Sequence, residues 1–187
     1  MVLAGFAFSW LGVSVRDDAW ERKNPAASTV LGCAFLTLSM AVAAGNLGEG
    51  PSLWENVFSS AVAVSGLFTL WVAFEIAAQI SRSITEERDV ASGLRFGSLL
   101  LAWGLILGRA VTGNWHSCGA TIIDAVRDGW PVVVLWLAAL PVELWLRPGR
   151  MRPFPSWFAS GVFPAAIYLE AAIAWDWHLG RWEGMPK

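Results

Sequence analysis

Residues 91–110 read ASGLRFGSLLLAWGLILGRA and contain a regular series of glycines. The four glycines, Gly93, Gly97, Gly104 and Gly108, fall at offsets that lie on one face of an α-helix. The stretch is almost wholly apolar, so we expect lipid rather than water as its solvent. In lipid, helices associate through close backbone approach, which small residues four positions apart permit. The pattern predicts a membrane helix with one smooth packing face.

An earlier stretch, residues 26–45 (AASTVLGCAFLTLSMAVAAG), repeats this spacing 65 residues upstream. Its small residues are Ser28, Gly32, Ser39 and Ala43. Residues outside the two ladders agree at the same offset: Glu21 with Glu86, Asn24 with Asp89, and Ala26 with Ala91. We therefore expect Gly97 and Gly104 to contact a neighbouring helix backbone closely, and Gly32 and Ser39 to do so in the other copy.

The repeat divides a single membrane domain, residues 1–187, into units. Repeat 1 covers about residues 6–80, repeat 2 covers about residues 81–147, and an additional C-terminal span covers residues 158–178. Each repeat reads as a helix, a short charged loop and a small-residue helix. Because each unit crosses twice, the copies have the same orientation, and we expect a pseudo-two-fold axis along the membrane normal.

Composition supports a membrane protein, since 56% of the residues are hydrophobic and only 15% are charged. The apolar residues form runs that approach the roughly 20 residues needed to cross a bilayer. The five predicted spans are 26–45, 57–80, 90–111, 130–146 (extended by 120–126 through a kink near Pro131) and 158–177. Met1–Val15 is predicted to add a short helix. The expected fold class is an all-α polytopic transmembrane helical bundle of five spans plus this N-terminal helix.

The loop charges predict the orientation. Arg and Lys gather in alternate loops, around Arg22, Arg88 and Arg150, and the linker 46–56 has none. The positive-inside rule places these basic loops in the cytoplasm and the C-terminus outside. The net charge of -2, without a basic stripe, excludes nucleic acid as a partner. The expected partners are the lipid bilayer and a protein partner or further copies of the chain in the membrane.

A short motif at the start of each small-residue helix suggests a family. The first copy has an acidic turn, Asp17 and Asp18, followed by Glu21, Asn24 and Ala26; the second copy has Glu86, Asp89 and Ala91. This arrangement resembles the duplicated YjfL-like bacterial inner-membrane family, a domain of unknown function, over roughly residues 6–147. The resemblance implies a membrane fold and a bacterial inner-membrane location, and it implies no established activity.

Ionisable residues inside the spans are the main candidates for function, because charge is costly in lipid. Glu170 lies near the middle of the last span, where it could bond to a neighbouring helix, handle a proton or cation, or contact a partner subunit. Glu75 and Arg95 lie at matched depth on consecutive helices, which predicts an ion pair. Glu143 has Arg147 four residues later and is expected to pair locally.

The opposite side carries a second charged group around the 112–120 connection. It comprises Arg109, Asp124, Arg127 and Asp128, with Trp115, His116 and Cys118 in the same loop. His116 and Cys118 could bind a soft metal, but two ligands are too few for a closed site. No cofactor is expected. Because no nucleophile–base pair, phosphate loop or metalloprotease helix is present, the sequence predicts that the protein is not an enzyme.

Two functions fit these observations. The first is a non-catalytic scaffold or accessory subunit of a larger membrane assembly, suggested by the small-residue faces. The alternative is a small cation or solute transporter or channel with a path between the two repeats, which would need a polar cavity joining Glu75, Arg95 and Glu170. A third class, a membrane enzyme acting on lipid, would need a clustered outer site that the sequence does not assemble.

Overall fold

Within residues 7–47, 52–113, 117–147 and 156–180, which the computed structural model describes, every regular element is a helix. The all-α prediction is therefore confirmed. The elements are η1 (Val15–Glu21), α2 (Pro25–Gly45), α3 (Leu53–Ala78), α4 (Ile80–Thr85), α5 (Val90–Val111), α6 (Cys118–Gly129), α7 (Pro131–Leu146), η2 (Phe158–Val162) and α8 (Phe163–Leu179). The two η elements are single π-helical turns.

The membrane-spanning helices agree with the predicted runs. Four are long and apolar enough to cross a bilayer: α2, α3, α5, and η2 together with α8. The pair α6 and α7, which is bent by 43° where Pro131 begins α7, passes the same test when the two helices are taken together as one span. Proline at the first helical position lacks the N–H that would continue the preceding helix, which explains the bend there. The protein is a multi-pass membrane protein.

Of the predicted N-terminal helix, the structure describes residues from 7 onward, and residues 7–10 form one helical turn. The chain then turns at Gly12, whose φ of 84° suits a residue without a side chain. A Cβ atom at this position would lie 2.7 Å from Cβ of Ser81. Phe8 and Val13 are buried in the core, so this segment packs against the bundle.

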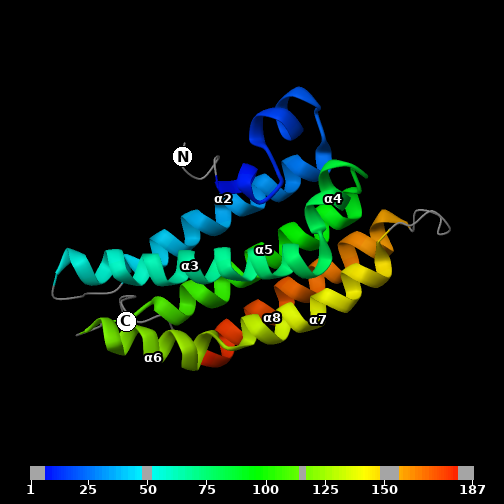
Figure 1. The fold of residues 1–187 in the computed structure, drawn as a ribbon. Coiled ribbons are helices and arrows are strands. Elements are labelled where there is room, and N and C mark those ends of the chain that lie inside the picture. Colours follow the sequence, from blue (N-terminus) through cyan, green and yellow to red (C-terminus); the bar gives the residue numbers. More distant parts are fainter. Residues whose placement is uncertain (1–6, 48–51, 114–116, 148–155, 181–187) are drawn as a thin grey trace.

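The central element is α5, which packs against α2, α3, α7, η2 and α8 (Figure 1). Aromatic rings of α3 pack on α5. Phe74 stacks on Phe96 with ring centroids 5.5 Å apart, and Trp71 contacts Phe96 edge-on with ring centroids 5.3 Å apart. Trp103 is also fully buried beside Phe74. Because α5 is enclosed on so many sides, its residues make most of the intramolecular contacts discussed below.

The loops before α2 and α5 use the same hydrogen bonds 65 residues apart. The Arg22 N–H donates to the Asp17 carbonyl at 3.0 Å, and the Glu87 N–H donates to the Arg82 carbonyl at 3.2 Å. Each loop then passes through a left-handed residue, Lys23 (φ 48°) or Arg88 (φ 52°). Asn24 and Asp89 follow as helix N-caps, and each accepts two backbone N–H bonds. The recurrence is structural as well as sequential.

The glycine ladder of α5 lies directly against α2. A Cβ atom on Gly93 would lie 2.9 Å from Cα of Ala26, and one on Gly104 would lie 2.6 Å from Cγ2 and 3.4 Å from Cα of Thr37. Gly97 and Gly108 make similar approaches to Cys33 and Ala44. The order of these contacts shows that α2 and α5 run parallel at the close distance that only small residues allow.

The equivalent ladder of α2 behaves differently. Ser28, Gly32, Ser39 and Ala43 are all exposed, and a Cβ atom on Gly32 would meet nothing within 4 Å. The prediction that Gly32 and Ser39 make close helix contacts is therefore wrong within the described chain. The reason is that α5 covers the other face of α2, the one that carries Ala26, Cys33, Thr37 and Ala44.

The contact between α5 and η2–α8 follows the same plan. Gly161, Ala165, Ala172 and Asp176 have the spacing of the ladders. A Cβ atom on Gly161 would lie 3.0 Å from Cα of Ala91, the residue equivalent to Ala26. Each later helix thus packs its small-residue face on a different face of the preceding helix. A two-fold axis would exchange α2 and α5, so the contact of Gly93 with Ala26 would require a contact of the equivalent residues, Ser28 and Ala91. Ala91 contacts Gly161 instead, and the predicted pseudo-two-fold axis is therefore wrong.

Candidate functional site

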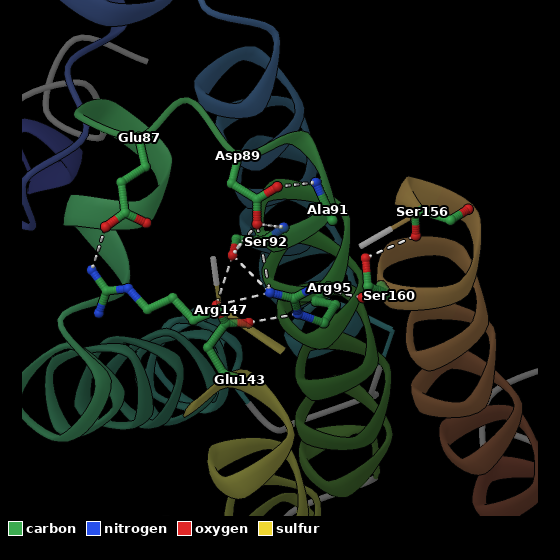
Figure 2. Close-up of polar contacts among 9 residues, drawn as sticks. All are labelled: Glu87, Asp89, Ala91, Ser92, Arg95, Glu143, Arg147, Ser156 and Ser160. Carbon is green, nitrogen blue, oxygen red and sulfur yellow. Dashed lines mark hydrogen bonds and ion pairs between the residues drawn. The ribbon is translucent and has the colours of Figure 1, made fainter. Parts of the chain in front are cut away.

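A buried arginine forms the polar centre of the bundle at the end where η1, α4 and η2 lie. Arg95 of α5 is only 2% exposed, and Glu143 of α7 is 3% exposed. Arg95 Nε donates to Glu143 Oε2 at 2.7 Å, and Nη2 donates to Oε1 at 3.0 Å, so the pair is bidentate (Figure 2). Arg95 Nη1 donates to the Ser160 carbonyl of η2 at 2.5 Å. One guanidinium therefore joins α5, α7 and η2.

Ser92 in the first turn of α5 and Asp89, the N-cap of this helix, complete the arginine cluster. Ser92 Oγ accepts from Arg95 Nη2 at 2.7 Å and lies 2.7 Å from Glu143 Oε1. Asp89 lies 3.8 Å from Arg95 and caps the helix by accepting from the N–H groups of Ala91 and Ser92. The helix N-terminus favours this carboxylate, because the helix dipole is positive there. Every charge in the cluster has a partner.

The predicted ion pair between Glu75 and Arg95 is wrong. Glu75 instead accepts from the backbone N–H of Ser81 at 2.9 Å and from its hydroxyl at 2.5 Å. The residue of α3 that faces α5 is Phe74, one position away, and one residue rotates a side chain by roughly 100° around a helix. Depth in the membrane follows from position along α3, but it does not determine which face of the helix carries Glu75.

The predicted local pairing of Glu143 with Arg147 is also wrong. Arg147 Nη1 donates to the Ala78 carbonyl at 3.0 Å, and Nη2 lies 3.5 Å from Glu87 (Figure 2). Arg147 therefore joins the end of α7 to the end of α3 and to the loop between α4 and α5. The repeat contains a signal for the pair of Arg95 with Glu143. Glu143 corresponds to Glu75, the predicted partner of Arg95, when the register shifts by three residues.

Glu170 lies midway along the last span and is exposed, so its carboxylate points away from the helices described. The hydrogen bonds of the described residues do not join it to a neighbouring helix, one of its expected roles. Of the expected roles of Glu170, handling of a proton or cation and contact with a partner subunit are left.

The arginine cluster has no room for a substrate. The space lined by Phe74, Arg95, Glu143 and Tyr168 leaves no volume for a water molecule. A solute therefore has no space beside Arg95 and Glu143, and the contacts of the cluster fix helix positions.

The opposite end of the bundle carries the second charged group, here called the far-end cluster: Arg109, Asp124, Arg127, Asp128 and Asp176. Arg127 lies 2.9 Å from both Asp124 and Asp128, whereas Arg109 turns to Asp176 of α8 at 3.6 Å. Asp176 is the member that the sequence analysis missed, because it lies on a distant helix. Trp115 and His116 lie outside the described residues.

An apolar groove begins beside the far-end cluster. Its volume is about 320 Å³, and it runs between α5, α7 and α8. It is lined by Ile106, Trp130, Pro131, Val134, Leu135, Ala171, Ala174 and Trp175. Trp175 connects groove and cluster, because its indole N–H donates to the Asp128 carbonyl at 2.9 Å. The groove therefore offers an apolar surface that ends at charged groups.

Comparisons with known proteins give one informative similarity. The chain is 34% identical over 106 residues to the probable peptidoglycan glycosyltransferase FtsW of Methylococcus capsulatus, a match that covers 57% of this chain and 26% of that protein. The match thus spans about a quarter of the relative's length. No family model and no solved structure matches. The prediction that the chain is not an enzyme is contradicted, because this relative is named as a probable peptidoglycan glycosyltransferase.

Proposed function

We propose that this membrane protein takes part in peptidoglycan glycosyl transfer, with the far-end cluster as the reacting site. The observation that carries the proposal is the 34% identity to FtsW over 106 residues. Because the match spans only 26% of that relative, the proposal concerns participation in the reaction, either by this chain itself or as one part of an assembly.

The chemistry of the far-end cluster supports this role. Glycosyl transfer needs a group that takes the proton of the attacking hydroxyl and a positive charge that stabilises the leaving group. Asp124 and Asp128 have side chains that are 17% and 21% exposed, so they are reachable but partly desolvated. Arg127, 66% exposed, supplies a cation between them. Base and cation are therefore adjacent.

The apolar groove suggests the class of substrate. A molecule with an apolar tail and a polar sugar-bearing head could place its tail between α7 and α8 and its head at Arg127. Trp130 and Trp175 lie at the boundary, where indole rings are favoured because they have an apolar body and a polar N–H. The positive-inside rule, applied to the loop charges, predicts that this end faces the outside of the cell, which is the side where peptidoglycan lies.

The test measures polymer formation in membrane vesicles from cells that produce the chain and from cells that lack it. Vesicles are supplied with radiolabelled peptidoglycan precursors, and label in polymer is counted. We expect more polymer with the chain, and a loss of about tenfold in Asp128→Asn, equivalent to 1.4 kcal/mol in the barrier.

Glu55→Gln is the matched control, because Glu55 lies in the first turn of α3 at the same end but outside the cluster. It should keep full polymer formation. Equal label in polymer with and without the chain would refute the proposal.

A second candidate role is a scaffold or accessory subunit within a larger membrane assembly. The observation that favours it is that the bundle leaves the ladder face of α2 and the carboxylate of Glu170 exposed. Solubilisation in mild detergent, followed by sizing and identification of co-purifying proteins, tests this role. A particle of one chain with no co-purifying protein would contradict it.

A further inference from the structure

We propose that copies of this chain associate head to tail in the membrane, through one exposed face at each end of the helix row α2–α5–α8. The ladder face of α2 comprises Ser28, Gly32, Ser39 and Ala43. The receiving face of α8 comprises Ala159, Ala166, Glu170 and Trp177. In the proposed contact, the ladder face of α2 in one copy packs on the receiving face of α8 in the next copy. This contact does not depend on the proposed glycosyl transfer.

The same contact already occurs twice within the molecule. In the first instance the ladder of α5 packs on α2, with Gly93 against Ala26. In the second instance the ladder of η2–α8 packs on α5, with Gly161 against Ala91, and Asp176 pairs with Arg109 at the other end. Ala26 and Ala91 are equivalent residues of the repeat. One helix geometry is therefore used in consecutive steps.

Each helix in the row has two packing faces. The ladder is the face whose small residues pack on the preceding helix, and the receiving face is the face on which the ladder of the following helix packs. The receiving residues of α2 are Ala26, Cys33, Thr37 and Ala44. Their equivalents in α5 are Ala91, Ser98, Ala102 and Arg109, and their equivalents in α8 are Ala159, Ala166, Glu170 and Trp177. The α2 and α5 sets are covered by the next helix, with Thr37 and Ala102 both 0% exposed.

The two ends of the row are left incomplete in complementary ways. All four receiving residues of α8 are exposed, and all four ladder residues of α2 are exposed. A second copy of the chain therefore supplies the missing half of each contact. Because the two halves are different surfaces, the association is heterologous, and it closes into a ring or extends as a filament.

The polar residues of the two faces meet at one level. Gly104 packs against Thr37, and the residues equivalent to this pair at the new contact are Ser39 and Glu170. In the single chain the Ser39 hydroxyl donates to the Phe35 carbonyl at 2.9 Å. At the contact it turns to donate to the carboxyl group of Glu170, which is otherwise costly to hold at a lipid-facing site. By the same equivalence Gly32 meets Ala166, two small residues that permit close approach.

The test uses cysteine cross-linking of the full chain in membranes, in a background where Cys33 and Cys118 are replaced by alanine. One tagged copy carries Gly32→Cys and a differently tagged copy carries Ala166→Cys, and the two are produced together and oxidised. We expect a dimer band that contains both tags, since disulfides form only when Cα atoms approach within about 7 Å. Val72→Cys, exposed on α3 at a similar depth, replaces Gly32→Cys as the control and should give no band.

Two outcomes would overturn the proposal. The first is no mixed band for Gly32→Cys with Ala166→Cys and none for Ser39→Cys with Glu170→Cys. The second is a Gly32→Cys band between like copies as strong as the mixed band, which would indicate a two-fold contact.

A size measurement in mild detergent separates association from folding. Gly32→Leu leaves the single chain undisturbed, because open space surrounds this position, but it would hold the two copies apart. We expect the particle to fall to one chain that keeps its helical circular dichroism signal. A particle of unchanged size would count against the contact.

Discussion

Helices α2 and α5 carry the same ladder of small residues, follow loops with the same hydrogen bonds, and yet differ in what covers them. The ladder of α5 is buried against α2, whereas the ladder of α2 is exposed. The difference arises from position in the row, since α5 has a neighbour on both faces and α2 has one on its receiving face. A small-residue spacing therefore marks a face that is able to pack, and the neighbouring helices determine whether it is covered.

The two units also differ in charge at an equivalent position. Arg95 of α5 corresponds to Val30 of α2, which is fully buried and apolar. Glu143 meets Arg95, but the corresponding acid of the preceding unit, Glu75, has no arginine to meet and instead accepts from Ser81. One substitution between the copies thus converts an interhelical ion pair into a helix-capping contact.

Removing this charge difference should have the largest effect. Arg95→Leu makes α5 resemble α2 but leaves Glu143 buried without its cation, and such losses cost about 3–5 kcal/mol. Thermal unfolding in detergent should show a large decrease in stability. The double variant Arg95→Leu with Glu143→Leu should recover much of it, because no lone charge stays behind. A double variant less stable than either single variant would contradict this account.

The second comparison places the same residue in the two ladders. Gly104→Leu should destabilise the bundle by about 1–3 kcal/mol or more, because its side chain would collide with Thr37. Gly32→Leu, in the exposed ladder, should leave the unfolding temperature of the single chain unchanged. Equal unfolding temperatures for the two variants would show that the ladder of α5 does not fix the distance to α2.

The helix caps test whether the two loops are energetically equivalent. Asn24→Ala and Asp89→Ala should each cost about 1 kcal/mol, the usual value for a lost N-cap. Each variant also loses contacts beyond the cap: the Asn24 amide donates to the Ile84 carbonyl at 2.7 Å, and Asp89 accepts from the Ser92 hydroxyl at 2.8 Å and lies 3.8 Å from Arg95. The two losses should therefore be similar. Chemical denaturation of each variant measures this. Ser52→Ala, which removes the exposed cap of α3, is a suitable reference.

The smallest effect is expected at the left-handed residues before the caps. Lys23→Gly and Arg88→Gly should raise stability by up to about 1 kcal/mol, since glycine adopts a positive φ without the strain of a side chain. Arg22→Gly is the control, because Arg22 has a right-handed backbone and should only lose stability. Similar changes in all three variants would exclude backbone strain as the cause.

Much of the fold could be predicted from sequence because it depends on local patterns. Apolar runs identified the membrane spans, proline identified the bend before α7, and the repeat identified loops that prove to share their hydrogen bonds. The far-end cluster was also recognised in part, because Asp124, Arg127 and Asp128 are close in sequence. These features need only the chain's own periodicity or adjacency.

The partners of the buried charges could not be predicted in this way. Depth along a helix follows from counting residues, and it correctly brought Arg95 to the level of acidic side chains. The choice between Glu75 and Glu143 depends on how each helix is rotated about its axis, and that rotation is set by all of its neighbours together. Phe74, packed between α3 and α5, turns Glu75 away from Arg95.

An all-helical, multi-pass membrane bundle of recurring units with small-residue faces follows from the order of the amino acids alone. Helix packing adds which of those faces are filled, that α8 packs on α5 as α5 packs on α2, and that one face of α2 and one of α8 remain open. The two kinds of information differ because periodicity defines a face of a single helix. Which face is covered is a property of at least two helices, and it depends on their relative rotation and order in the row.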